Sequence, residues 1–185
     1  SKGGWRYRPR EEGDTSVVGW QLMALKSGHL AGLKIDPKVI DQVCHFLDDV
    51  KLDNTGSRYG YMRGRSSVMN LSVSPTEPMN STTPIGLLCR MYTGWDRDEQ
   101  GLVQGVPALN HWQRPDMGMY FYYYATQVMY QYGGEPWTSW NGWMRDYLVE
   151  NQDQVGSQAG SWKFQGEYDS GRLYCTAMAA MTLEV

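Results

Sequence analysis

Apolar residues recur along most of this chain at the spacing of a helix that buries one face. In the first such stretch Val17, Val18, Leu22 and Leu25 fall close to this spacing. The pattern predicts helices over residues 15–26, 37–51, 81–95, 97–112, 119–134, 136–152 and 171–185. The alternation typical of strands is nearly absent, and residues 68–74, the best strand candidate, are interpreted as a loop. The sequence therefore predicts an all-α fold.

Capping residues support several of these boundaries. Asp14 or Thr15 can cap the first helix, and Asp36-Pro37 offers an N-cap followed by proline at the first helical position. Glycines near 28 and 32, and a Gly-Gly pair at 133–134, are typical of helix ends.

Short phrases of glycine followed by an aromatic residue divide the chain into repeats. The phrases are "GGWRY" from Gly3, "GSRYGY" from Gly56 and "GSWKF" from Gly160, with a weaker unit near residues 110–112. This spacing predicts about four units of roughly 52 residues, each an entry phrase followed by a helical hairpin. Residues 1–185 are thus expected to form one domain or a fragment of one. Stacked hairpins form a solenoid when open and a toroid when closed.

The last predicted helix, from Gly171, has no hairpin partner in the sequence. It carries Leu173, Ala177, Ala180 and Met181. Uncovered apolar surface of this kind usually finds a partner, so we expect self-association or coverage by the N-terminal segment.

Charge and composition exclude several classes of protein. The net charge is −3 and no block of Lys or Arg is present, so no nucleic-acid partner is expected. No apolar run approaches membrane-spanning length, and residues 1–10 show no signal-peptide pattern. The three cysteines lie far apart without a CxxC motif and are interpreted as buried free thiols. Eight Trp and 13 Tyr against three Phe favour either an aromatic cavity with a polar rim or aromatic staples at helix ends.

Four stretches together resemble a known family: "GDTSVVGWQLMAL", "YYYATQVMYQYGGEPW", "GSWKF" and "GRLYCTAMAAMTLEV". The chain resembles the C-terminal part of the terpenoid cyclase and protein prenyltransferase α/α-toroid superfamily. It looks closest to bacterial squalene-cyclase-like proteins with prenyltransferase and squalene oxidase repeats. The resemblance implies helical hairpins that form part of an α/α toroid.

One segment is similar to the QW motif of these cyclases. Gly118, Tyr123, Gln127, Gly133 and Trp137 follow the order of the motif, with two extra residues before the tryptophan. The resemblance implies that Gln127, Gly133 and Trp137 form a structural staple, in which the glutamine bridges helix ends and the tryptophan stacks on it.

The family's catalytic motifs are incomplete here. "DTSVVGWQ" is similar to the prenyltransferase zinc segment, but Ser16 stands at the cysteine position and Thr82-Thr83 replaces the His-Thr pair. A serine hydroxyl is a poor zinc ligand, so no metal and no cofactor are expected. "FLDDVKLD" is not the DxDD acid motif, and we interpret its carboxylates as a solvated helix end.

Candidate site residues remain in two groups. The cavity-lining candidates are Trp20, at the edge of a helical stripe through Asp14, Val17, Val18, Gln21 and Leu25, and Tyr120, Tyr123 and Tyr124. At helical spacing, the same tyrosines with the nearby tryptophans more often form a helical core. The catalytic candidates are Asp14, Glu167 and Asp169, because α/α toroids also host carbohydrate-active sites built on two carboxylates.

Three functions stay open. The first is a binding or scaffold domain without recognisable catalytic motifs, whose partner is an apolar small molecule or a protein segment. The second is an isoprenoid cyclase or transferase with its catalytic residues in an N-terminal half outside this sequence. The third is a carbohydrate-active enzyme.

Overall fold

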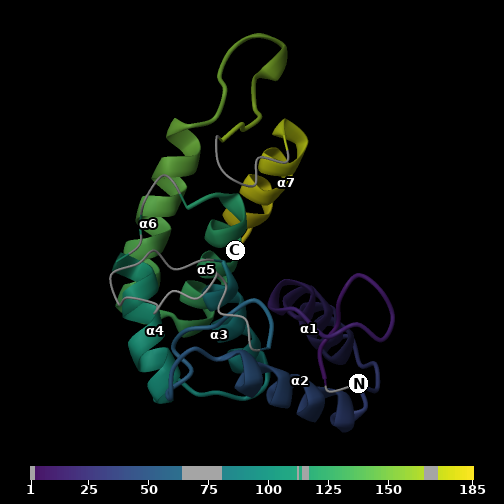
Figure 1. Ribbon diagram of the computed structural model, residues 1–185. Coiled ribbons are helices and arrows are strands. Elements are labelled where there is room, and N and C mark those ends of the chain that lie inside the picture. Colours follow the sequence, from purple (N-terminus) through teal and green to yellow (C-terminus); the bar gives the residue numbers. More distant parts are fainter. Residues whose placement is uncertain (1–2, 64–80, 112, 114–116, 165–170) are drawn as a thin grey trace. The chain divides into compact units, whose positions relative to one another are not determined.

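The computed structural model describes residues 3–63, 81–111, 113, 117–164 and 171–185 (Figure 1). The helices are α1 Thr15–Leu30, α2 Pro37–Val50, α3 Thr82–Tyr92, α4 Gln100–His111, α5 Met119–Tyr132, α6 Gly134–Glu150 and α7 Arg172–Leu183, with a 3-10 turn at Gly156–Gln158. Strands are absent from the described residues, which hold one isolated bridge between Lys51 and Tyr59. The all-α prediction is confirmed, while residues 68–74 lie outside the described residues.

Helix starts follow the predicted caps. The Asp14 carboxylate accepts a hydrogen bond from the Val17 N–H, and the Asp36 carboxylate accepts one from the Lys38 N–H. The predicted end of the first helix was too early, because α1 continues through Gly28 to Leu30. Gly32 then turns the chain with φ +83°, a conformation that glycine adopts without strain.

The chain divides into two compact units, Ser1–Gly105 and Val106–Val185. In the first unit α1 packs against α2 and α3, and α2 packs against α3. Helix α3 is buried at every position from Thr82 to Arg90, whereas α2 buries one face through Val43, Phe46, Leu47 and Val50. Helix α3 is therefore the centre of this unit.

The second unit is built around α5, which packs against both α6 and α7. All α5 residues from Phe121 to Thr126 are buried, whereas α6 and α7 each bury one face. The opposite face of α7 is uncovered: Leu173 is 85% exposed, and Ala177 and Ala180 are exposed. The apolar face expected from the sequence is present, and self-association through it stays a prediction.

Both units share one order of elements, in which a helix packs against the next-but-one helix: α1 against α3, and α5 against α7. In addition, the aromatic residue of each described entry phrase is hydrogen-bonded to residues at or near the start of a helix. The pairs are Trp5 with Asp14, Tyr59 with Thr82 and Thr83, and Trp162 with Thr176. This order agrees with repeated helical hairpins. A toroid, and a single domain of about four repeats, stay predictions.

Candidate functional site

Asp14 is the one predicted catalytic candidate among the described residues, since Glu167 and Asp169 lie outside them. It is 0% exposed and forms the N-cap of α1. Its Oδ1 accepts from the Val17 N–H at 2.9 Å and from the Ser16 hydroxyl at 2.6 Å. Its backbone N–H donates to the Trp5 carbonyl at 3.0 Å. Asp14 Oδ1 thus performs the whole capping role.

The other carboxylate oxygen has a different environment. Asp14 Oδ2 is buried and accepts no hydrogen bond from any described residue. Its charged neighbour is Arg6, whose Nε lies 3.7 Å away, too far for a hydrogen bond. Arg6 Nε is itself buried and has no acceptor among the described residues, although the Arg6 side chain as a whole is 32% exposed. The charges of Arg6 and Asp14 are paired, but neither Arg6 Nε nor Asp14 Oδ2 makes a hydrogen bond with a described residue.

Tyr61 borders this pair. The Thr15 N–H and hydroxyl bind the Tyr61 carbonyl, at 2.9 and 3.2 Å, and hold it against the start of α1. Burial, the negative charge of Asp14 and contact with Tyr7 raise the pKa of Tyr61 to about 12, although a hydrogen bond with Ser16 acts in the opposite direction. We call Arg6, Tyr7, Asp14, Ser16 and Tyr61 the Asp14 cluster.

Trp20 lies one helical turn beyond Ser16 on α1 and is 39% exposed. The buried stripe of α1 consists of Thr15, Val18, Gly19 and Leu22. The sequence predicted that the inward-facing stripe of this helix passes through Gln21. This position was wrong by one residue, because Gln21 is exposed and Leu22 is buried instead. Trp20 lies off the core-facing stripe, and its role in lining a cavity stays a prediction.

The positions similar to zinc ligands have other partners. Ser16 is hydrogen-bonded to Asp14, Thr82 donates to the Tyr59 carbonyl at 2.6 Å, and Thr83 accepts from the Tyr59 N–H at 3.2 Å. Within the described part of the chain no group of three or more His, Cys, Asp or Glu side chains could hold a metal ion.

The carboxylates of "FLDDVKLD" serve the structure of the first unit. Asp48 and Asp49 are half-exposed and form ion pairs with Arg90, at 2.5 Å, and with Arg63, at 2.6 Å. Asp53 accepts hydrogen bonds from the backbone and side chains of the following turn, which lower the pKa of its carboxyl despite partial burial.

The buried arginine of this unit was not predicted. Arg90 is 4% exposed, donates to the Tyr59 hydroxyl at 3.1 Å and lies 4.8 Å from the ring centre of Trp95. Burial raises the pKa of Tyr59 to about 12, although the charge of Arg90 opposes this shift. A single arginine inside the apolar stretch "LLCRMY" is the only trace of this arrangement in the sequence.

Three tyrosines of α5 contact one another, and Tyr122 contacts Trp143 and Tyr147 of α6. Tyr124 is fully buried and meets the rings of Tyr120 and Tyr123 edge-on, at 5.1 and 5.3 Å between centres. In the segment similar to a QW motif, Gln127 is hydrogen-bonded to Tyr123, and Trp137 meets Tyr130 edge-on at 5.3 Å. These residues contribute to packing, and both the cavity role and the QW-type staple stay predictions.

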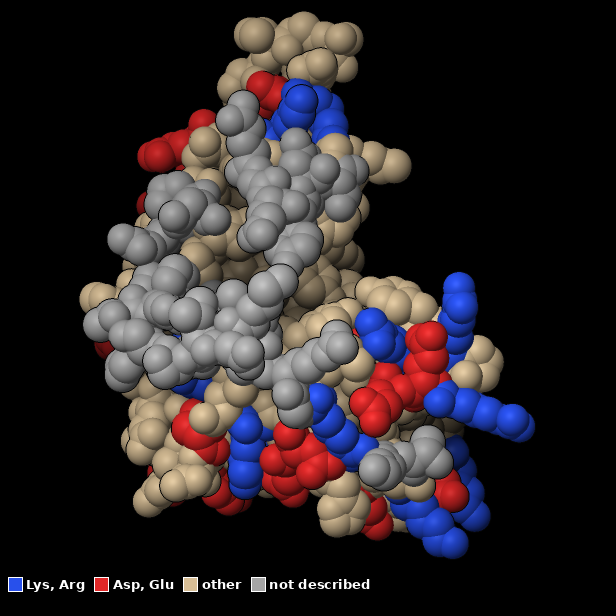
Figure 2. Space-filling view, viewed as in Figure 1, with Lys and Arg blue, Asp and Glu red and all other residues tan. Residues whose placement is uncertain are grey.

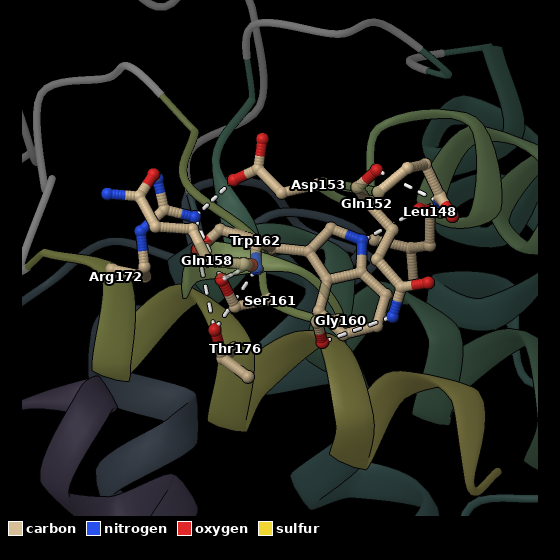
Figure 3. Close-up of polar contacts among 10 residues, drawn as sticks. Leu148, Gln152, Asp153, Gln158, Gly160, Ser161, Trp162, Arg172 and Thr176 are labelled. Atoms are coloured by element: carbon tan, nitrogen blue, oxygen red, sulfur yellow. Dashed lines mark hydrogen bonds and ion pairs between the residues drawn. The ribbon is translucent and has the colours of Figure 1, made fainter. Parts of the chain in front are cut away.

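The loop between α6 and α7 is tied by a polar network around Trp162 (Figure 3). The indole Nε1 donates to the Leu148 carbonyl at 2.7 Å, and the backbone N–H donates to the Thr176 hydroxyl at 3.1 Å. Arg172 at the start of α7 forms an ion pair with Asp153. The network satisfies polar groups near two helix ends, which indicates a structural role for the phrase "GSWKF".

Charges on the visible face do not form a single-sign patch among the described residues, because Lys and Arg are interleaved there with Asp and Glu (Figure 2). None of the described helices is both long enough and apolar enough to span a bilayer.

No protein-family model matches the sequence, no curated protein matches it, and no solved structure matches it.

The Asp14 cluster makes a titration prediction. We expect Asp14→Asn to lower the pKa of Tyr61 from about 12 toward the ordinary tyrosine value of about 10, because a neutral amide removes one of its causes. The wild-type shift stabilises the folded protein below about pH 10, and this stabilisation is lost as the pH rises toward 12. Ultraviolet difference titration against Tyr61→Phe measures this pKa.

Asp36→Asn is the matched control, since Asp36 is also a helix N-cap but is exposed. An asparagine is a good N-cap, so both variants should fold. An unchanged Tyr61 pKa in Asp14→Asn would contradict the electrostatic link.

Proposed function

We propose that this chain is a ligand-binding domain of the α/α-toroid type, similar to squalene-cyclase-like and prenyltransferase-like proteins. It binds a mainly apolar small molecule beside the Asp14 cluster at the N-terminal end of α1. The supporting observation is the Asp14 carboxylate, which is fully buried while one of its oxygens accepts no hydrogen bond from any described residue.

A purely structural carboxylate would not need this arrangement. Leaving a buried polar group without a hydrogen bond costs about 1–3 kcal/mol, and capping α1 uses only Oδ1 of Asp14. Small-molecule sites are mostly apolar and carry a few polar groups that fix the ligand. Tyr61 supplies an aromatic ring near the carboxylate, the exposed side chain of Tyr7 contacts Tyr61, and Trp20 supplies a third ring one turn beyond Ser16.

The enzymatic alternatives have less support among the described residues. A carbohydrate-active site needs a second carboxylate, and both candidates for it lie outside these residues. An isoprenoid cyclase or transferase needs an acid or metal motif that the matching positions lack. The resemblance suits a binding domain with an apolar ligand, and the order of helices in each unit agrees with repeated helical hairpins.

We test binding with three probes that share an octyl chain: 1-octanol, methyl octyl ether and octylammonium. At least one should bind saturably by calorimetry, and Trp20→Ala should weaken that binding about tenfold, since exposing about two CH2 groups of the octyl chain costs about 0.8 kcal/mol each. The control is Trp137→Ala, which removes a half-buried tryptophan from the second unit and should leave binding unchanged. The proposal fails if no probe binds saturably, or if Trp20→Ala binds as well as the wild type.

A further inference from the structure

Two buried groups of opposite hydrogen-bonding character face each other in the Asp14 cluster. Asp14 Oδ2 is a carboxylate oxygen and Arg6 Nε is a donor, and the two atoms lie 3.7 Å apart. Neither has a hydrogen-bond partner among the described residues. At this distance they do not bond each other, but one atom placed beside both could reach each at hydrogen-bond length.

The atom that satisfies both groups must donate to Asp14 and accept from Arg6. A hydroxyl oxygen does both. An ether or ketone oxygen only accepts, an ammonium group only donates and would lie against the Arg6 charge, and a carboxylate would lie against the Asp14 charge. The pair therefore favours a ligand atom that both donates and accepts, of which a hydroxyl oxygen is the simplest case.

We propose that the Asp14–Arg6 pair is a hydroxyl-binding subsite, and that the ligand is an alcohol whose hydroxyl donates to Asp14 Oδ2 and accepts from Arg6 Nε. This inference rests on the proposed function, because it names the polar group of the ligand bound there. It adds the chemical class of that ligand.

The carboxylate of the subsite is fixed, whereas the Arg6 side chain is held only through its backbone. Asp14 Oδ1 is fixed by Ser16 and Val17, which sets the plane of the carboxylate. The segment that carries Arg6 lies close to the start of α1. A Cβ added to Gly13, next to Asp14, would lie 2.8 Å from the Cα of Gly4, two residues before Arg6. Arg6 reaches both Asp14 and solvent, so movement of its partly exposed side chain gives a ligand access to Oδ2.

The same three octyl-chain probes separate this inference from the proposed function. We expect 1-octanol to bind at least tenfold more tightly than methyl octyl ether, which cannot donate, and than octylammonium, which cannot accept. Equal dissociation constants for all three would overturn the hydroxyl subsite and leave the binding function standing. Equal binding is also the result expected if the pair holds only an ordered water. Binding by none of the three would overturn both proposals.

A variant reverses the expected preference. Asp14→Asn keeps an oxygen for the Val17 N–H and replaces the unused acceptor with an N–H donor, so methyl octyl ether should then bind as well as 1-octanol or better. Arg6→Leu removes the donor side and should reduce the advantage of 1-octanol over octylammonium. Thermal melts with and without probe check that both variants fold. A tenfold preference for 1-octanol that persists in both folded variants would overturn the proposal.

Discussion

Gly86→Ala should destabilise the first unit by more than about 3 kcal/mol, at or beyond the upper end of ordinary overpacking. A Cβ at this position in α3 would lie 2.2 Å from Cγ and 2.3 Å from Cδ2 of Tyr59. Tyr59 cannot easily move away, because it is fully buried, its hydroxyl accepts from Arg90, and its backbone is bonded to Thr82 and Thr83. Chemical denaturation measures the loss.

The control is Gly142→Ala in the interior of α6, where nothing lies within 4 Å of the new Cβ. Alanine stabilises a helix interior by about 0.5–1 kcal/mol relative to glycine, so this variant should be slightly more stable than the wild type. If Gly86→Ala were as stable as the wild type, the close packing of α3 against Tyr59 would be wrong.

Helix boundaries were predicted well where a side chain caps them. Helix α2 begins at Pro37 directly after its Asp36 cap, and α1 begins at Thr15 after Asp14. Boundaries marked only by glycine were less certain: α1 continues through Gly28, because a glycine costs only about 1 kcal/mol inside a helix that packs well elsewhere. Likewise Pro107 lies inside α4, where tertiary packing overrides the local signal.

Long-range contacts explain what the sequence could not predict about the candidate site. Asp14 was predicted both as a cap and as a candidate site residue, since its position before an apolar stretch is visible locally. Tyr61 joins the cluster across a separation of 46 residues from Thr15, and Arg90 meets Asp48 across 42. Neither of these long-range contacts produces a periodic pattern in the sequence. The hydrogen-bonding state of Asp14 Oδ2 likewise depends on how the chain near Arg6 crosses the start of α1.

The two tryptophans of contrasting exposure give the second large prediction. Trp140→Ala should cost about 3–5 kcal/mol, the usual range for truncating a buried aromatic side chain. Trp140 is 0% exposed, its ring meets Trp143 at 5.3 Å, and its Nε1 donates to the buried Thr126 hydroxyl at 2.8 Å. Truncation removes the ring and leaves the Thr126 hydroxyl without this donor, and both effects destabilise the second unit.

Trp20→Ala makes the same chemical change on α1 and should cost only about 1 kcal/mol, because a side chain that is 39% exposed and lies off the buried stripe loses less on truncation. Trp140→Phe keeps one six-membered ring but loses the hydrogen bond and the volume of the five-membered ring, so its cost should be about 2 kcal/mol, below that of Trp140→Ala. Denaturant melts of the three variants give these values. A loss of 3 kcal/mol or more in Trp20→Ala would make Trp20 a core residue, and weakened probe binding in that variant would then reflect unfolding rather than a lost contact.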